Sequence, residues 1–515
     1  MDGSANWTEI GRTGGRDPLG MLSAVEYSYQ TLLPGMSTVT ERLRYYSFHC
    51  WWIKKYADLS PTTSALAYGD FARRFEFLYV LASLYDPSNP GRTSGELGLS
   101  GAIVASKMIK ESENVFNFQY VTSRDTPSEN RYMQPAMGDF INTYAPQMRE
   151  IGLLHRPEEH GLNVPTATGL QIAEKFEHSL GAVADLFVQT AQEGCVDRAT
   201  LEALSICGPG AIPPDGEEAN MLRDLLMGRL EVNPDDVSEY RRDEAIRVLK
   251  AAEARRDTLL LILDTAQANP SEEVSQEMLR WKWFETPVTD GHPRAYAHAR
   301  WQYYQAGDTA RVTCEALLDH AVDEISRGSR DLPTLLMDLT HPLAKIGSLE
   351  DWLVTIEARQ SEVTMQEIQA RTLDAAVELD DLMSPLARLY FEWADREEEL
   401  ADAFPSGNGR QSVRNLLQWM KRNAQRDARS AMIDFFRDFI LLRHLAVAAG
   451  KFRANRAYTY LFELHEHELH WKQSKSANPS GPRLRTAVRF LEDLSLLEEG
   501  SITERGRELL DEAAQ

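Results

Sequence analysis

The segment QMREIGLLHRPEEHGLNVPTATGLQIA spans residues 147–173, and its pattern returns as FLEDLSLLEEGSITERGRELL at residues 490–510. Each segment begins as a helix that ends near an acidic residue and an apolar pair. A polar stretch follows, and a Thr-x-x-Gly sequence then opens a second helix. Gly152 is a typical helix-stop residue, and the short apolar runs on either side of the polar stretch fit strands. The sequence therefore predicts helix, strand, turn, strand and helix in both places.

The two segments align without a gap across the end of their first helix. Met148–Leu154 matches Leu491–Leu497, and Thr166 or Thr168 is the expected cap of the second helix, with Thr166 corresponding to Thr503. Three further pairs follow from this alignment: Glu150 with Asp493, Ile151 with Leu494, and Gly152 with Ser495. We therefore expect the chain to contain two related modules far apart in the sequence.

This pattern resembles the winged-helix superfamily, whose sequence cue is L-x-x-x-G-L-L followed by L-T-x-x-G. The resemblance implies a small fold of helices and a β-hairpin wing. It also implies binding of DNA, RNA or protein, because winged helices serve all three purposes, and it implies no particular chemical activity.

Outside the two modules strand signals are weak, so the predicted fold class is mainly α, a multi-helical protein with two small winged-helix modules. The sequence divides into five regions: an N-terminal helical domain (1–134), a winged-helix-like module (135–180), an acidic helical middle region (181–404), a basic helical block (405–477) and a C-terminal winged-helix-like module (478–515). The sequence PSGNG at 405–409 is the expected linker.

Residues 43–53, LRYYSFHCWWI, are apolar on nearly all sides of a helix, which predicts a buried core helix. Thr38, followed three residues later by Glu41, predicts a capping box at its start. The alternative is an exposed aromatic platform for stacking bases, beside Arg42 and Arg44.

Composition indicates a globular protein in a reducing compartment. The chain has 515 residues, 43% of them hydrophobic, and a formal net charge of −23. No apolar run approaches the ~18 residues that a membrane span needs, and the N-terminus lacks the pattern of a secretory signal. The four cysteines are scattered, which argues against a disulfide framework. We expect a cytoplasmic protein that does not associate with a membrane.

The charge is unevenly distributed. Residues 181–409 contain 21 Lys and Arg against 44 Asp and Glu, whereas residues 410–489 contain 16 against 6. Basic side chains along helices bind phosphates without reading sequence, so nine residues are candidate nucleic-acid contacts: Lys421, Arg422, Arg426, Arg429, Arg453, Arg456, Arg483, Arg485 and Arg489. The alternative is that they pair with acidic residues of the same chain or of a partner subunit.

The sequence LHEHELH, residues 464–470, contains three histidines. If this stretch is helical, Glu466 and His470 lie four residues apart on one face, and His467 lies three residues before His470, a convergence that metal ligands need. The motif is not H-E-x-x-H, so the zinc-protease signature is missing. Solvated polar side chains are the simpler interpretation, and we predict no cofactor.

No G-x-S-x-G motif is present, and no catalytic residue is assigned. The sequence favours a non-catalytic, DNA-associated or scaffolding subunit of a bacterial multi-protein system, such as an antiphage or plasmid defence system, with protein subunits as partners. The order of regions also resembles kleisin-type subunits, which implies an SMC-type ATPase partner. A metal-dependent enzyme that uses residues His465–His470 is a third hypothesis.

Overall fold

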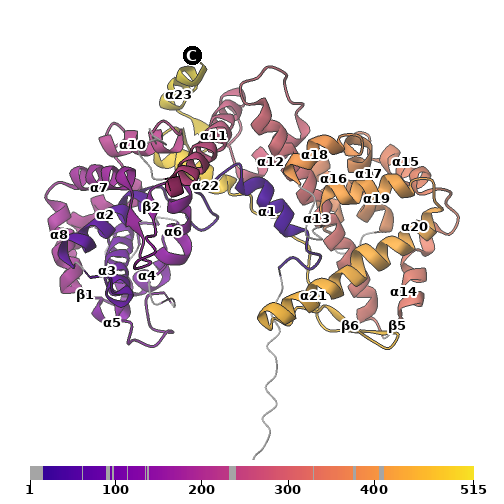
Figure 1. Cartoon of the computed structure of the whole chain (residues 1–515), viewed down its shortest axis with the longest axis horizontal. Coiled ribbons are helices and arrows are strands. Elements are labelled where there is room, and N and C mark those ends of the chain that lie inside the picture. The colour runs from indigo at the N-terminus through magenta and orange to yellow at the C-terminus, as the bar shows by residue number, and fades with distance from the viewer. Residues whose placement is uncertain are drawn as a thin grey trace, which may run out of the picture. The chain divides into compact units, whose positions relative to one another are not determined.

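The structure is a computed structural model, and it describes residues 16–60, 62–88, 93–95, 98–112, 114–133, 135, 138–230, 239–328, 330–374, 378–404 and 411–514. The predicted linker at 405–409 lies outside these residues. The fold is mainly α, as predicted (Figure 1). The chain forms two compact units, each assembled from three separate stretches: unit 1 from residues 1–30, 280–290 and 298–481, and unit 2 from residues 31–279, 291–297 and 482–515. No described helix is both long and apolar enough to cross a membrane.

Unit 2 contains the N-terminal helices and the last module of the chain. Its elements are α2 (Arg44–Leu59), α3 (Ala65–Leu84), α4 (Ala102–Glu111), β1 (Val115–Asn117), α5 (Gln119–Thr122), α6 (Phe140–Glu150), β2 (Leu154–His155), β3 (Val164–Pro165), α7 (Ala167–Leu180), α8 (Val183–Glu193), β4 (Cys195–Asp197), α9 (Arg198–Leu204), η1 (Ser205–Cys207), η2 (Pro209–Ala211), α10 (Glu217–Leu226), α11 (Glu239–Ala268), α22 (Leu484–Asp493), β8 (Leu497–Glu498), β9 (Ser501–Ile502) and α23 (Glu504–Ala514).

Both predicted modules form helix, strand, strand and helix. The first is α6–β2–β3–α7, in which Leu154 pairs with Pro165 across an antiparallel hairpin. The second is α22–β8–β9–α23, in which Leu497 pairs with Ile502. The secondary structure predicted from the two repeated segments is therefore confirmed.

The aligned threonines make the same contacts in the two modules. The Oγ1 of Thr166 accepts a hydrogen bond from Gly169 N at 3.1 Å, and the Oγ1 of Thr503 accepts one from Gly506 N at the same distance. Each hydroxyl also donates to the carbonyl of an aligned residue just after the first helix, Gly152 at 2.7 Å and Ser495 at 2.8 Å. One hydroxyl thus caps the second helix and joins it to the end of the first.

The glycine of Thr-x-x-Gly is required by a close backbone approach. A Cβ atom at Gly169 would lie 2.2 Å from the carbonyl oxygen of Leu153, and one at Gly506 would lie 2.4 Å from that of Leu496. Because real Cβ atoms do not approach backbone oxygens so closely, a larger residue would push the second helix off the hairpin. The close packing of the second helix on the hairpin therefore requires glycine at this position of the repeated motif.

Helix α2 is the buried core helix that the sequence predicts. Tyr45, Tyr46, Phe48, Trp51 and Trp52 are all at most 1% exposed, so they do not form an exposed stacking platform. The core is built from aromatic contacts, among them the stacked rings of Phe48 and Tyr79 with centroids 4.2 Å apart.

The predicted start of α2 is wrong. The helix begins at Arg44 and not after Thr38. The carboxylate of Asp493 accepts a hydrogen bond from Leu43 N, just before the helix, at 2.9 Å and forms a buried ion pair with Arg42 at 2.8 Å. A tertiary contact with the far end of the chain therefore holds the start of α2, where the sequence predicted a local capping box.

Glu76 is a buried acid that holds the start of α6. Its carboxylate accepts hydrogen bonds from the backbone N–H groups of Asp139 and Phe140, both at 3.1 Å, and from the hydroxyl of Tyr132 at 3.4 Å. Burial, reinforced by the charge of Asp139, raises the pKa of Glu76 to about 8 despite these donors. The side chain therefore binds a proton much more tightly in the folded protein than in the unfolded chain.

Unit 1 packs helices around the long helix α13. Its elements are α1 (Leu22–Gln30), α12 (Gln276–Glu285), α13 (Ala295–Ser326), β5 (Arg330–Asp331), α14 (Leu332–Leu339), η4 (His341–Leu343), α15 (Leu349–Arg359), α16 (Met365–Thr372), α17 (Leu379–Trp393), α18 (Glu397–Ala403), α19 (Val413–Asn423), α20 (Ala428–Asp434), η5 (Phe435–Leu441), α21 (Leu442–Asn455), β6 (Phe462–His465) and β7 (Glu468–Trp471). The first residues of α12 and of α13 belong to unit 2, and the rest of each helix belongs to unit 1.

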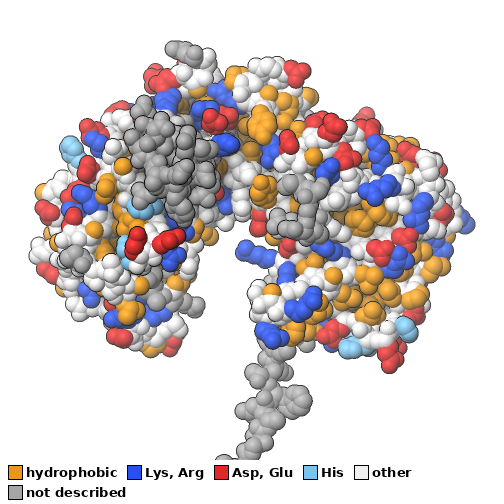
Figure 2. Space-filling view, in the orientation of Figure 1, with side chains coloured by type: hydrophobic (Ala, Val, Ile, Leu, Met, Phe, Trp, Pro, Cys, Tyr) orange, Lys and Arg blue, Asp and Glu red, His pale blue; other side chains and the backbone are white. Residues whose placement is uncertain are grey.

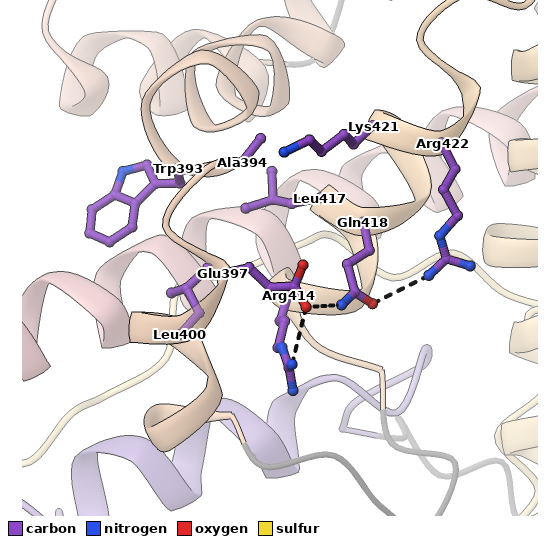
Figure 3. Close-up of a pocket in the computed structure, with 9 residues that line it drawn as sticks. All are labelled: Trp393, Ala394, Glu397, Leu400, Arg414, Leu417, Gln418, Lys421 and Arg422. Atoms are coloured by element: carbon purple, nitrogen blue, oxygen red, sulfur yellow. Dashed lines mark hydrogen bonds and ion pairs between the residues drawn. The ribbon is translucent and has the colours of Figure 1, made fainter.

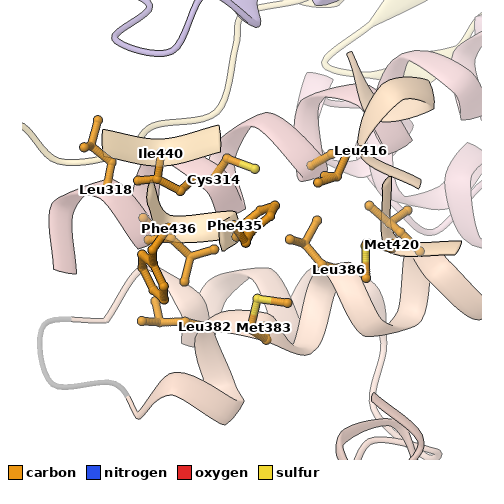
Figure 4. Packing of buried hydrophobic residues seen from close by; sticks show 14 of the residues in the cluster. Cys314, Leu318, Leu382, Met383, Leu386, Leu416, Met420, Phe435, Phe436 and Ile440 are labelled. Atoms are coloured by element: carbon orange, nitrogen blue, oxygen red, sulfur yellow. The ribbon is translucent and has the colours of Figure 1, made fainter. Parts of the chain in front are cut away.

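The core of unit 1 lies between α13, α17, α19 and the helical run α20–η5–α21. Figure 4 shows Cys314 and Leu318 from α13 facing Phe435, Phe436 and Ile440 from η5. These five residues are at most 1% exposed. The apolar faces of these helices are thus mutually buried, which fixes the orientation of their polar faces.

A buried ion network fastens the segment before the C-terminal module to α13. Asp308 is completely buried and accepts from Arg280 at 2.8 Å, from Arg311 at 2.9 Å and from Ser480 N at 3.0 Å. Burial acts to raise the pKa of Asp308, but the two arginines outweigh it and the pKa is lowered. Arg311 also donates to the carbonyl of Asn478 at 2.6 Å. The extended segment is therefore held by charge-assisted hydrogen bonds.

We predict that the free energy of unfolding depends on the protonation state of the Glu76 carboxyl group. Because the folded pKa of about 8 lies above the unfolded value of 4.5, the stabilisation present at low pH is lost as the pH rises between these values. Glu76→Gln, which carries no charge, should flatten this part of the stability profile. Urea denaturation of both proteins between pH 5 and pH 8.5 measures it, and parallel profiles would contradict the assignment.

We predict that Asp308→Ala destabilises unit 1 by about 3–5 kcal/mol, because it leaves two arginines buried without their carboxylate. Asp323→Ala is the matched control, since Asp323 is exposed on the same helix and should change stability by no more than about 0.5 kcal/mol. Urea denaturation measures both changes. Equal effects of the two substitutions would show that the network contributes nothing specific.

Candidate nucleic-acid interface

The nine predicted phosphate contacts are divided between the two units. Lys421, Arg422, Arg426 and Arg429 lie on α19, on α20 and in the turn between them, whereas Arg453 and Arg456 lie at the end of α21, all in unit 1. The others, Arg483, Arg485 and Arg489, lie in or beside α22 of unit 2. Each unit therefore carries its own set of candidate contacts.

Several of the cations in unit 1 are already paired. Lys421 Nζ lies 2.5 Å from Asp395, and Arg426 lies 2.7 Å from Asp434. The pKa of Lys421 is raised by its hydrogen bond and charge interaction with Asp395. Arg429 donates to the carbonyl of Met337 at 3.2 Å. The alternative of pairing within the chain thus applies to the first two of these side chains.

Three of the predicted contacts in unit 1 are exposed and form no ion pair with any carboxylate that the structure describes. Arg422 donates to Gln418, at 3.4 Å, and Arg453 donates to the carbonyl of Ala449 in its own helix. Arg456 lies 5.9 Å from the ring centre of Phe452. Figure 2 shows blue and red side chains interspersed over the surface.

The arginines of unit 2 fit the interface less well. Arg483 is buried, and its guanidinium donates to the carbonyl of Leu33 at 3.1 Å. Arg485 approaches Glu41 at 3.5 Å, and Arg489 approaches Glu492 at 4.0 Å. The sequence-based assignment of Arg483 as an exposed contact is therefore wrong, because its side chain is buried and donates to a backbone carbonyl inside the unit.

A π-helical segment, η5, interrupts the helical run from Ala428 to Asn455. It places the rings of Phe435 and Phe439 in a stack with centroids 5.3 Å apart, and Trp419 of α19 packs against both, at 5.1 Å and 5.6 Å. Phe435 is buried, whereas Trp419 and Phe439 are partly exposed. Such π-helical segments occur frequently at functional sites, and nothing in the sequence predicted this one.

A hollow of about 180 Å³ lies along α19, close to the predicted contacts. Figure 3 shows the residues that line it: Trp393, Ala394, Glu397, Leu400, Arg414, Leu417, Gln418, Lys421 and Arg422. The sequence predicted two of these, and missed the contribution of α17 and α18 because they are distant in the sequence.

Three cations from one helix point toward this hollow, but carboxylates already occupy part of it. Arg414 Nη2 donates to Glu397 at 3.1 Å, and Gln418 donates to the same oxygen. The floor is apolar, since Trp393 and Leu417 are 3% exposed and Leu400 is fully buried. An anion in the hollow would therefore accept charge-assisted hydrogen bonds from Arg422, at the rim, more readily than from Arg414.

The histidine-rich stretch is a β-hairpin and not part of the predicted basic helical block. β6 and β7 pair antiparallel, so that Glu463 faces His470 and His465 faces Glu468. His467 and Glu466 occupy the turn, whereas His470 lies in β7. The helical spacing that suggested convergence of His467, His470 and Glu466 therefore does not exist, because alternate residues of a strand share a face.

The polar face of this hairpin is held by ion pairs. Glu463 accepts from Tyr458 at 2.6 Å and lies 2.9 Å from Lys472 and 3.0 Å from His465. Burial acts to raise the pKa of Glu463, but these donors outweigh it and lower the pKa to about 2. Within the described residues, no group of three or more His, Cys, Asp and Glu side chains is placed to hold a metal ion.

Three cysteines are buried, and their thiols are poor nucleophiles. Burial raises the pKa of Cys207 and of Cys314 to about 12, and raises that of Cys50 further. The neighbouring His49 is also buried, and burial lowers its pKa well below the ordinary value. These groups are uncharged at neutral pH and contribute to packing.

The described geometry thus contains an interrupted basic surface on unit 1, with an anion-sized hollow and a partly exposed aromatic cluster beside it. Compared with known proteins, the chain matches no family model, no curated protein and no solved structure.

Proposed function

We propose that this chain is a non-catalytic, DNA-associated subunit of a multi-protein system, and that unit 1 contacts the phosphate backbone of the DNA. The observation that supports the proposal most directly is the exposure of Arg422, Arg453 and Arg456 without a described carboxylate partner. Guanidinium groups in this state bind phosphate oxygens without first breaking an internal ion pair.

The spacing of these arginines suits a duplex. Arg422 precedes the helical run from Ala428 to Asn455, and Arg453 and Arg456 end it. At 1.5 Å per residue the run is about 40 Å long, which is comparable with the ~34 Å of one turn of duplex DNA. The contacts are few and lack base-reading partners, so we propose binding that is weak and independent of sequence.

The proposal predicts a moderate salt dependence. If each of the three arginines neutralises one phosphate, the logarithm of the affinity should fall with the logarithm of the salt concentration with a slope of about −2.7. Raising NaCl from 50 to 200 mM should then weaken binding about 40-fold. Fluorescence anisotropy with a labelled 20-base-pair duplex measures this. An affinity that does not respond to salt would contradict the proposal.

A charge-matched pair of triple variants tests the positions. Arg422→Glu, Arg453→Glu and Arg456→Glu together should abolish DNA binding. The control combines Lys421→Glu, Arg426→Glu and Arg437→Glu, which change the net charge equally at side chains that are already paired with carboxylates. The control should retain more affinity. If both triple variants lose binding equally, the net charge and not these arginines is responsible, and the proposed contacts are wrong.

A further inference from the structure

A groove of about 660 Å³ lies within unit 2, between the start of α10 and the C-terminal module. One wall is α10 with the preceding Pro214 and Asp215, and the other is α23 from Glu504 to Glu512. That length of helix corresponds to about 12 Å, so the groove is elongated. An amphipathic helix laid in a groove is a common mode of peptide recognition.

The floor of the groove is apolar. Leu494, Leu496 and Leu509 line it and are at most 4% exposed, as is Ala219 on the opposite wall. The turn between α22 and β8 supplies the two leucines on either side of its positive-φ residue, Ser495. These side chains form a narrow apolar base beneath a lining that is mostly polar.

The rim of the groove is acidic, and the acidic groups are regularly spaced. Glu504, Glu508 and Glu512 recur every four residues along α23, so they lie one above another on the side of the helix that faces the groove. Asp215 stands on the opposite rim. Glu504 and Glu508 are exposed and form no ion pair with any residue in the described part of the chain. A partner with cations at the same spacing would complement this row.

Two ion pairs now occupy part of the rim, and both are easily replaced. Arg505 lies 2.5 Å from Asp215, whose side chain is 90% exposed, and Arg229 lies 3.0 Å from Glu512, whose side chain is 54% exposed. Ion pairs at such exposure contribute about 0–1 kcal/mol. Exchange of these arginines for those of a partner therefore costs little.

We propose that this groove binds a basic, amphipathic helical segment of a partner protein, with Lys or Arg side chains on the glutamate row and aliphatic side chains on the leucine floor. Four carboxylates line the groove against Arg223 and Arg505, and Arg229 pairs with one of the four, so a net charge of −1 remains. This negative charge favours a cationic segment over nucleic acid. This surface belongs to unit 2, so the proposal is independent of DNA binding by unit 1.

The direct test uses the full chain and a labelled 16-residue helical peptide with Lys at every fourth position and Leu on the same face. Fluorescence anisotropy should show binding that weakens with salt, and a peptide with Glu in place of Lys should not bind. Glu508→Lys should weaken binding at least about tenfold, because it places a like charge opposite the peptide. Glu499→Lys is the matched control, since Glu499 is exposed in the hairpin of the same module and does not line the groove. It should stay within about twofold of the unchanged protein.

A second variant separates shape from charge. Asn220→Trp fills the groove from an exposed position of α10 without altering the net charge, and it should also weaken binding about tenfold. Absence of peptide binding, or equal binding by the Glu508→Lys and Glu499→Lys variants, overturns the proposal. Concentration-dependent self-association that Glu508→Lys abolishes would also overturn it, because the occupant would then be a second copy of this chain.

Discussion

The contact between Asp493 and the start of α2 is the interaction on which unit 2 depends. Its carboxylate satisfies the backbone N–H of Leu43 and the guanidinium of Arg42 in a place with almost no access to water. The first module makes a parallel contact, because Glu150, which aligns with Asp493, accepts from Gly35 N at 2.8 Å. Both modules thus use the last acidic residue of their first helix to hold the segment that leads into α2.

Unit 1 uses buried charge for a similar purpose. Asp308 organises Arg280 and Arg311 and ties the backbone of Ser480 to α13. Paired buried charges are costly to disrupt. They therefore hold in place an extended segment that has no helical hydrogen bonds of its own. In both units, therefore, a carboxylate supplied by a helix fixes a non-helical segment that lies far away in the sequence.

The sequence predicted local structure better than tertiary partners. The two modules were predictable because Thr-x-x-Gly reflects contacts within a few tens of residues, and α2 was predictable because its aromatic residues cover all sides of the helix. The cap of α2 was missed since its partner lies 450 residues away. The stretch LHEHELH was assigned to the wrong structure because it has five polar residues and only two leucines, which do not alternate and so hide the period of a strand. The sequence identified the arginines of the candidate interface as basic side chains. It did not show which of them pair with carboxylates, because that depends on where other helices lie.

The π-helical segment η5 lets the helical run from Ala428 to Asn455 hold an extra residue without turning the helix that follows. Each residue of an α-helix advances the side chains by about 100°, so an extra residue in a regular helix would turn every later side chain by that angle. The wider π-turn absorbs the extra residue within one turn. A chain lacking a single residue between Phe435 and Leu441 would therefore form a regular helix there and still present Arg453 on nearly the same side. The segment thus changes the spacing of side chains around Phe435 and Phe439, and not the direction in which the basic end of α21 points.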